Sequence, residues 1–519
     1  MPFSIGSQGM LSTLHSASPF GVDACLIEVE VHERVGDPKI TVVGLPDTAV
    51  RESRERTVAA LVNSGFSRNR GPVTVNLAPA DLKKEGTAFD LPIALGLIAN
   101  RENIPRETFA DTVIVGELAL DGTVRSVRGG LAIALEAKAR GFARLLGPPS
   151  MAREASVVAG IEIISVATLG EAYQHLIGEV PLEPEPVRAT EFFREASTYS
   201  IDLADVRGQQ HVKRAAEVAV AGGHNLLMIG SPGTGKSMIA KRLPSIMPTM
   251  SEDEAIETTK IHSVGGLLDR DNTFVATRPF RSPHHTISDV GLLGGGSNPG
   301  PGEISLAHNG ILFMDELPEF RRSTLEVLRQ PLEDGKVTIS RAAGKLTFPA
   351  SFMLVAAMNP CPCGYHGDLK RECRCSPNQI AKYRDRISGP LLDRIDLHVE
   401  VPLVEYSELS SAEDGESSEN VRGRVETARA LQRNRYTGEP SVGFNAALTP
   451  KLMKSCCQLD AEGSQFLEHA MNEMDFSARA HDRILKVSRT LADLDGAESI
   501  ASNHVLEAIQ YRTLDRNLW

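Results

Sequence analysis

Strand-like and helix-like patterns alternate over the first 180 residues of the chain. The runs ACLIEVEV, KITVVG and VTVNLA are rich in Val, Ile and Thr and predict strands, whereas AVRESRERTVAALVNSG predicts a helix that ends at Gly65. Further along, TVIVGELAL and GIEIISV predict strands on either side of a helix in GGLAIALEAKARG. This alternation predicts an α/β domain over residues 1–180.

Changes in the pattern mark the regions that follow. PLEPEPV (181–187) holds three prolines and two glutamates, which neither a helix nor a central strand tolerates, so we predict an extended linker over 181–200. A second α/β block follows over 201–404, and a polar stretch predicts a flexible loop over 405–420. Residues 421–519 space their apolar positions at three and four, which predicts a helical C-terminal domain.

A glycine-rich loop lies between a predicted buried strand, LLMI, and a predicted helix, MIAKRL. Its sequence, GSPGTGKS (230–237), matches the pattern G-x-x-x-x-G-K-[ST]. Main-chain N–H groups of such a loop surround phosphate oxygens, Lys236 would contact the β- and γ-phosphates, and Ser237 would offer its hydroxyl to Mg²⁺. We therefore predict an ATP and Mg²⁺ site made by Gly230, Ser231, Pro232, Gly233, Thr234, Gly235, Lys236 and Ser237.

Polar residues end two further predicted buried strands. ILFMDE (311–316) would place Asp315 at a strand tip near the glycine-rich loop, where it would hold the Mg²⁺ water shell, and Glu316 would activate the attacking water. MLVAAMN (353–359) ends in Asn359, whose amide could reach the γ-phosphate or the water. A simple turn before Pro360 is the alternative interpretation of Asn359.

Four of the seven cysteines fall within fifteen residues, as Cys361-x-Cys363 and Cys373-x-Cys375. Four thiolates can close a tetrahedral Zn²⁺ site with a structural role, although C-x-C is tighter than the usual C-x-x-C and His366 is a substitute ligand. The alternative is four reduced thiols in a surface loop. The clustering favours zinc over a disulfide framework.

Composition and charge limit the classes of function. The chain of 519 residues is 41% hydrophobic and 24% charged, as is usual for a soluble globular protein. It has no signal-peptide pattern and no apolar run long enough for a bilayer, so we expect a cytoplasmic protein without a membrane partner. A net charge of -12 argues against a surface coated by nucleic acid, but it leaves room for a local basic element in a channel.

Long runs of the sequence resemble the ComM/YifB family of magnesium chelatase subunit I-like AAA+ ATPases. They include the glycine-rich loop with the segment before it, GILFMDELPEF, AAMNPCPCGYHGD and ISGPLLDRIDLHVE, and VVGLPDTAVRESRERTVAAL extends the likeness towards the N-terminus. The resemblance implies a P-loop AAA+ core with a helical lid, of the helix-2-insert group, that works as a homo-hexameric ring. It also implies ATP-driven branch migration of DNA recombination intermediates during natural transformation.

The resemblance assigns roles to several further residues. Asn359 would be sensor 1, Arg394 would reach the nucleotide of a neighbouring subunit, and Arg479 would reach the γ-phosphate of its own chain as sensor 2. Without the resemblance, a surface ion pair is the commoner fate of such an arginine. Three other arginines are reserve candidates for these contacts with the nucleotide: Arg384, Arg386 and Arg483.

Two segments fit a motor that grips a polymer inside a ring. DGKVTISRAAGKLTFPA (334–350) predicts a β-hairpin with its turn at Arg341–Gly344, where this group carries a pre-sensor-1 hairpin. Lys336, Arg341 and Lys345 would then contact DNA phosphates, and an ordinary solvated hairpin is the alternative. The Gly- and Pro-rich segment 278–303 resembles the helix-2 insert.

The N-terminal domain resembles the Lon-protease-like domain of ribosomal-S5-like fold. The slots for the catalytic Ser and Lys hold Ala88 and Ala132, which predicts an inactive protease scaffold. A basic stretch there suggests either DNA binding or a solvated helix face; it comprises Arg51, Arg54, Arg56, Arg68 and Arg70. The competing functions are a magnesium chelatase motor, a protein-remodelling ATPase without DNA activity and a Lon-like protease.

Overall fold

The computed structural model describes most of the chain as two compact units. The described residues are 10–67, 71–80, 84, 86–187, 199–268, 274–296, 300–341, 344–368, 370–404, 415–439 and 442–514. One unit comprises Met1–Ala196, Ala255–Val275 and Ser340–Thr347, and the other comprises Ser197–Glu254, Ala276–Ile339 and Phe348–Trp519. Within the described residues, no helix is long and apolar enough to cross a membrane.

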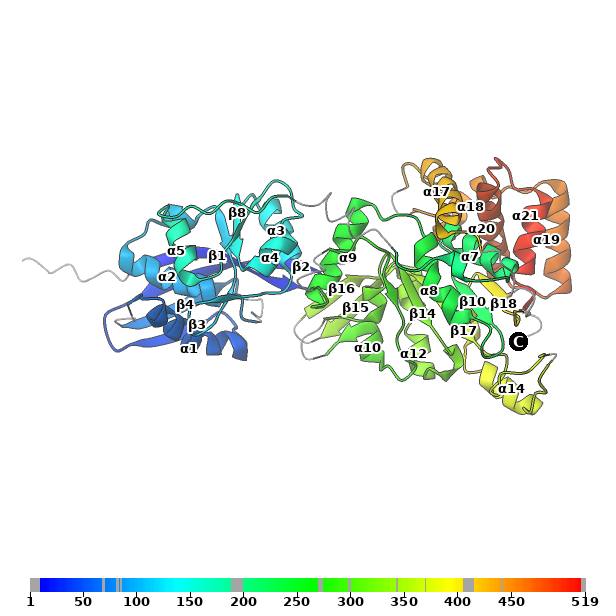
Figure 1. Cartoon of the computed structure of the whole chain (residues 1–519), viewed down its shortest axis with the longest axis horizontal. Helices are drawn as coiled ribbons and strands as arrows, with labels where there is room; N and C mark the ends of the chain where they lie inside the picture. The colour runs from blue at the N-terminus through cyan, green and yellow to red at the C-terminus, as the bar shows by residue number, and fades with distance from the viewer. Residues whose placement is uncertain are drawn as a thin grey trace, which may run out of the picture. The chain divides into compact units, whose positions relative to one another are not determined.

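The first unit is built on a mixed seven-stranded sheet in the order β3-β4-β2-β1-β5-β8-β9 (Figure 1). The strands are β1 (Met10–Phe20), β2 (Asp23–Glu33), β3 (Lys39–Val43), β4 (Pro72–Ala78), β5 (Thr112–Ile114), β8 (Arg144–Gly147) and β9 (Glu162–Ser165). Its helices are α1 (Thr48–Asn63), α2 (Asp90–Glu102), α3 (Gly130–Ala139), α4 (Pro149–Ala155) and α5 (Leu169–Leu176). The predicted α/β character of this region is confirmed.

Local sequence explains these elements. Asp47 caps α1 by accepting a hydrogen bond from the N–H of Val50, and the helix ends just before Gly65 as predicted. The run TVIVGELAL is not one strand, however, because Gly116 separates β5 from β6 (Glu117–Leu118), which pairs with β7 (Val124–Arg125). A Cβ at Gly116 would lie 2.6 Å from the side chain of Val124, so the close approach requires glycine.

The second unit holds a parallel five-stranded sheet in the order β11-β14-β17-β10-β18. Its strands are β10 (Leu226–Ile229), β11 (Phe280–Arg281), β14 (Ile311–Met314), β17 (Met353–Met358) and β18 (Leu397–Glu400). Every residue of β10, β14 and β17 is buried, which is why these strands are continuous apolar runs in the sequence. Because the strands are parallel, their carboxyl ends meet at one edge, where open α/β sheets bind ligands.

Helices complete the second unit, and a separate hairpin is divided between the two units, with Ser340–Thr347 assigned to the first. The helices next to the sheet in sequence are α7 (Gln210–Gly222), α8 (Lys236–Ile246), α10 (Asp289–Leu293), α11 (Glu303–Leu306), α12 (Arg322–Glu326), α13 (Arg329–Asp334), α14 (Pro377–Arg384) and α15 (Gly389–Leu392). Helix α9 (Glu252–Val264) falls mainly in the first unit. The predicted hairpin is confirmed as β15 (Lys336–Arg341) paired with β16 (Gly344–Pro349), on which Lys336 and Lys345 are exposed. The side chain of Arg341 lies outside the described part.

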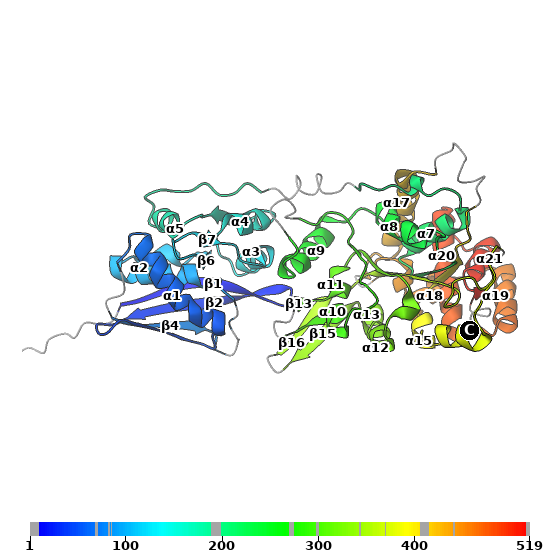
Figure 2. The same ribbon diagram turned by 60° about the horizontal axis from the view of Figure 1, so that its bottom comes forward.

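The C-terminal region is helical, as predicted. It comprises α17 (Ser418–Arg435), α18 (Pro450–Cys456), α19 (Ala461–Glu473), α20 (Ala478–Leu494) and α21 (Ser502–Gln510), and α19 and α21 lie side by side in both views (Figure 1 and Figure 2). The predicted loop over 405–420 is wrong at its end, because the Ser417 side chain accepts a hydrogen bond from the N–H of Asn420 and starts α17 at Ser418. Residues 405–414 of that loop lie outside the described part.

The predicted linker begins along the first sheet. Residues 181–187 have no regular structure, yet the N–H of Glu185 donates to the carbonyl of Ile163 in β9 at 2.8 Å. Leu182 packs against the core of the first unit. The start of the linker is therefore tied to the edge of the sheet, and residues 188–198 lie outside the described part.

Candidate functional site

The glycine-rich loop connects the end of β10 to the start of α8. Gly233 and Gly235 have φ angles of 84° and 90°, and Gly235 is the N-cap of α8. Both angles lie in the left-handed region that glycine adopts without strain. A Cβ at Gly230 would lie 2.3 Å from the carbonyl oxygen of Val401, so this position also has no room for a side chain. The loop therefore presents backbone at a helix N-terminus, which is a favourable place for phosphate.

Lys236 lies over the loop with only 8% of its surface exposed. Its Nζ donates to the carbonyl oxygens of Gly230 at 2.6 Å and Ser231 at 3.0 Å, and to Oδ1 of Asn359 at 3.3 Å. Burial lowers the pKa of Lys236, and the nearby charges of Asp315 and Glu316 oppose that shift. The ammonium group is thus held by three neutral acceptors, each of which a phosphate oxygen could replace.

The carboxyl end of β14 brings acidic groups to the same place. Ser237 donates its hydroxyl to Oδ2 of Asp315 at 2.5 Å, so the two predicted Mg²⁺ partners are in direct contact. Glu316 follows with a φ of 52° and an exposed side chain, and its N–H donates to Oδ1 of Asp315. The residues predicted from β10, β14 and β17 therefore meet at one edge of the sheet.

Two neighbours of this site were not predicted from the sequence. Nδ1 of His285, in the segment 278–303, lies 3.5 Å from Oε2 of Glu316, and the His285 ring packs on that of His284 at 4.1 Å between centroids. Gln209 donates from Nε2 to the carbonyl oxygens of Thr234 at 2.9 Å and Pro402 at 2.8 Å. The paired histidines were a visible signal, whereas a single glutamine before a helix carries none.

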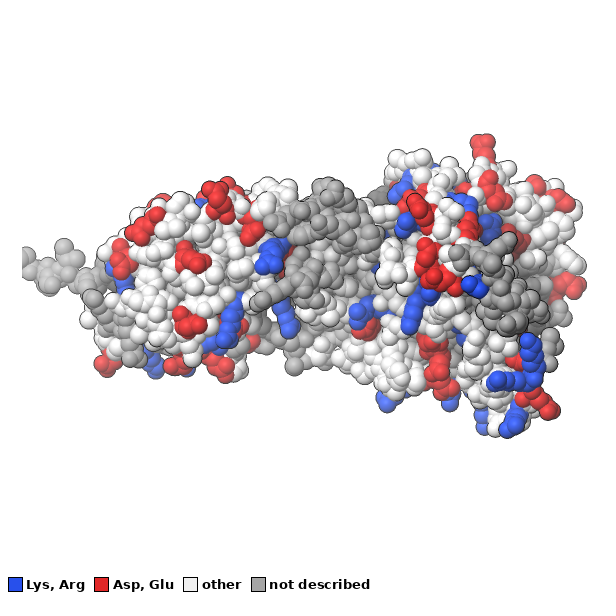
Figure 3. Space-filling view, viewed as in Figure 1, with Lys and Arg blue, Asp and Glu red and all other residues white. Residues whose placement is uncertain are grey.

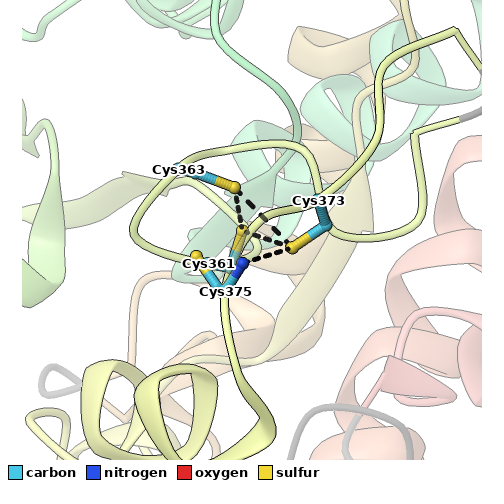
Figure 4. Close-up of side chains that lie close together, drawn as sticks. All are labelled: Cys361, Cys363, Cys373 and Cys375. Atoms are coloured by element: carbon cyan, nitrogen blue, oxygen red, sulfur yellow. Dashed lines mark hydrogen bonds between the residues drawn. The ribbon is translucent and has the colours of Figure 1, made fainter.

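The four clustered cysteines point towards one another between β17 and α14 (Figure 4). The Sγ–Sγ distances are 3.4 Å for Cys361–Cys363, 3.7 Å for Cys361–Cys373 and 3.6 Å for Cys363–Cys373, and all four sulfurs lie within 4.8 Å of one another. These distances are too long for disulfides, whereas a tetrahedron with Zn–S bonds of about 2.3 Å has edges of about 3.8 Å.

The chemistry of the cysteine cluster also suits a metal. Main-chain hydrogen bonds from Tyr365 and Arg374 lower the pKa of Cys363 to about 6 and favour its thiolate form, whereas burial and the neighbouring thiols raise the pKa of Cys373 and that of Cys375. The substitute ligand His366 is not part of the described group of candidate ligands. The donor set and its spacing are compatible with Zn²⁺.

Sequence comparisons cover nearly the whole chain. The family profiles described as magnesium chelatase, subunit ChlI, as subunit ChlI of Mg-chelatase, and as the ChlI C-terminal region match residues 202–409, 29–150 and 415–512. The chain is 45% identical over 516 residues to the competence protein ComM of Haemophilus influenzae, with 98% of each chain covered. It is 43% identical to the uncharacterized protein YifB of Escherichia coli and 43% identical to that of Salmonella typhimurium, again with 98% of each chain covered. The chain belongs to the ComM/YifB family. It is therefore a magnesium chelatase-like AAA+ protein of a competence-related ATPase family.

The arginines to which this family resemblance gave roles have partners within the chain. Arg394 is buried and ion-pairs with Glu333, 61 positions away. Arg479 is exposed and pairs with Asp393 at 3.1 Å, next to Arg394 in sequence. Arg479 therefore contacts the residue that precedes Arg394. The roles of both arginines stay predictions.

The reserve arginines differ in their surroundings. Arg386 is exposed and pairs with Glu319 at 2.8 Å, while both Nε and an Nη of Arg384 donate to the carbonyl of Pro360. Arg483 pairs with the buried Asp396. Of the three, Arg386 is the one whose guanidinium is half exposed and available to a neighbouring molecule.

The comparison of the N-terminal domain with a Lon-like protease stays a prediction. Ala88 and Ala132 are both buried. Within the basic stretch, Arg56 donates from Nε to buried Asp90 at 2.7 Å, so it is not part of a solvated face. Arg68 and Arg70, and the side chain of Arg51, lie outside the described part.

Proposed function

We propose that this protein is an ATP-hydrolysing homo-hexameric motor that acts on DNA and drives branch migration of recombination intermediates. The observation that carries the ATPase part is the meeting of Lys236, Ser237, Asp315 and Asn359 at one edge of the parallel sheet. The likeness to a competence protein over 98% of both chains supports the DNA part.

ATP would bind with its phosphates on the glycine-rich loop and its Mg²⁺ near Ser237 and Asp315. Lys236 would exchange its carbonyl partners for phosphate oxygens, Asn359 would contact the γ-phosphate, and Glu316 would orient the attacking water. Arg394 or, as a reserve, Arg386 would act on the nucleotide of a neighbouring protomer, and Arg479 would reach the γ-phosphate of its own chain. A Zn²⁺ ion held by Cys361, Cys363, Cys373 and Cys375 would have a structural role, because four protein ligands leave no open position.

DNA would be held by local groups of exposed basic side chains, which the net charge of -12 does not exclude. Lys336 and Lys345 are exposed on the β15–β16 hairpin. A second group of blue side chains gathers over the α14 region (Figure 3), where Lys370, Arg371, Arg374 and Lys382 are exposed. Both groups support contact with phosphates rather than with bases.

DNA-stimulated ATP hydrolysis tests this function against its alternative. A magnesium chelatase-type or protein-remodelling ATPase, which the ChlI profile matches favour, would hydrolyse ATP at a rate independent of DNA. We expect single-stranded or branched DNA to raise the kcat of the full chain for ATP. An unchanged rate at low salt, where phosphate contacts are strongest, would contradict the DNA part and leave the ATPase part standing.

A further inference from the structure

The segment that carries the cysteines packs directly on the glycine-rich loop. Gly364, between Cys363 and Cys373, has a φ of 85°, and a Cβ there would lie 2.5 Å from the ring of Pro232. The hydrogen bond from the N–H of Gly364 to the carbonyl of Cys361, at 2.9 Å, closes a tight turn at this point. The turn therefore packs against Pro232 so closely that no side chain fits between them.

Asp368 joins the same segment to the loop by a hydrogen bond. Its Oδ2 accepts from the hydroxyl of Ser231 at 3.0 Å, and its Oδ1 accepts from the N–H groups of Lys370 at 2.8 Å and Arg371 at 3.0 Å. One carboxylate therefore fixes the turn between the two cysteine pairs and holds the loop at the same time.

The other end of the segment reaches Lys236 through the main chain. Asn359, which accepts from Lys236 Nζ, is followed by Pro360 and by the buried Cys361. Arg384 of α14 donates to the carbonyl of Pro360 and fixes this connection. The cysteine segment thus flanks Lys236 on two sides, by Asp368 through Ser231 and by Pro360 through Asn359.

We propose that the four-cysteine segment, closed by Zn²⁺, is a brace that positions the phosphate-binding loop, with Asp368 as the positioning residue. This inference rests on the proposed ATP site and goes beyond a metal that merely stabilises the fold. The metal would hold the two cysteine pairs in place. The turn between them would then fix the position of Asp368, which holds Ser231. Loss of the metal or of the Asp368 contact loosens the loop and weakens nucleotide binding, whereas the groups that cleave ATP stay in place.

The test compares Asp368→Ala with Asp368→Asn and with Glu372→Ala, an exposed carboxylate in the same turn. Equilibrium binding of a fluorescent ATP analogue with Mg²⁺ and the zinc content of each full-length chain are measured together. We expect Asp368→Ala to keep one zinc per chain and to raise the Kd for the nucleotide about fivefold, as the loss of one hydrogen bond of ordinary strength predicts. Asp368→Asn, which keeps an acceptor oxygen, should recover most of the affinity, and Glu372→Ala should bind as the wild type does.

Three further measurements separate the brace from a general effect on folding. Adding Ser231→Ala to Asp368→Ala should cause little further weakening, because both changes remove the same bond. Removal of zinc with a zinc-selective chelator before MgATP is added should raise the Kd of the wild type more than that of Asp368→Ala. At saturating ATP, kcat should be nearly equal for the wild type and Asp368→Ala.

The possible failures are distinguishable. Purified chain without zinc, or Asp368→Ala that binds nucleotide as tightly as the wild type, overturns the brace and leaves the ATP site intact. The brace is also overturned if Glu372→Ala weakens nucleotide binding as much as Asp368→Ala does. A wild-type chain that binds no ATP overturns both the brace and the proposed function.

Discussion

At the scale of single residues, the site depends on side chains that hold one another before any ligand is considered. Lys236 is bonded to the loop and to Asn359, and Ser237 is bonded to Asp315. Glu316 differs, because its carboxylate is exposed and its described side-chain neighbour is His285. The residue that would activate water therefore lies 3.5 Å from a histidine of a different segment.

We expect His285→Ala to lower the kcat for ATP about tenfold, a smaller loss than removal of a general base causes. The reason is that the Glu316 carboxylate loses the group 3.5 Å away that fixes its direction. The Kd for ATP should not change, since His285 does not touch the phosphate-binding loop in the described contacts. Steady-state ATPase assays measure kcat and equilibrium binding of a nucleotide analogue measures the Kd, with His469→Ala, an exposed histidine on α19, as the control. An unchanged kcat would show that Glu316 needs no such partner.

At the scale of elements, the sequence predicts well those features that depend on neighbouring residues. The strand LLMI, the loop after it and the start of α8 are specified within about a dozen positions, and the structure contains each of them. The hairpin and the helical C-terminal region are likewise local patterns. The start of α17 was missed because a polar serine-rich stretch contains its own cap at Ser417.

Features that depend on distant residues could not be predicted in this way. Arg394 is buried and pairs with Glu333, and nothing in the sequence near Arg394 indicates that partner. Gln209 contacts both Thr234 and Pro402, which come together only in the folded sheet. The sequence therefore predicts the chemistry of the site better than the contacts that support it.

Helix α20 is joined to the strand β18 by a buried ion pair. Arg483 pairs with Asp396, which also accepts a hydrogen bond from the N–H of Asn225 at 2.9 Å. Burial alone would raise the pKa of Asp396, but Arg483, His224 and this N–H hold it below its usual value. A depressed folded-state pKa means that the pair stabilises the fold above the unfolded-state pKa of about 3.9, and that this stability is lost as the pH falls below it.

We expect Asp396→Asn to reduce stability by about 3 kcal/mol at pH 7, because it leaves the Arg483 charge partly buried and unpaired. This corresponds to a Tm lower by about 3–5 °C for a cooperative unit of this size. Thermal unfolding at a series of pH values is the measurement, with Asp482→Asn, a half-exposed carboxylate on α20, as the control. The difference in Tm should narrow below about pH 4. A Tm difference that does not change with pH would contradict the claim that the ionised Asp396 carboxylate provides the stabilisation.

At the scale of the whole molecule, the proposed function requires that ATP cleavage be coupled to a partner. Arg386 is exposed and pairs with Glu319, and under the proposal it would exchange that partner for the phosphate of a neighbouring protomer. The exposed lysines of the β15–β16 hairpin would provide a second point of contact, with DNA.

The hairpin lysines give a prediction about DNA. Replacing Lys336 and Lys345 by Ala should remove most of the DNA stimulation of ATPase activity and leave the rate without DNA unchanged. The dependence of DNA affinity on salt should also become shallower, because fewer phosphates are contacted. DNA titrations at several salt concentrations test this, with Lys451→Ala and Lys454→Ala on α18 as the matched control. Equal loss in both double variants would point to net charge alone.

The most direct measurement of the central claim is the movement of a labelled four-way DNA junction by the full chain in the presence of ATP and Mg²⁺. We predict that the wild type moves the junction, that Lys236→Ala neither binds ATP nor moves it, and that Glu316→Gln binds ATP without moving it. Wild-type protein that hydrolyses ATP and leaves the junction in place would contradict the account.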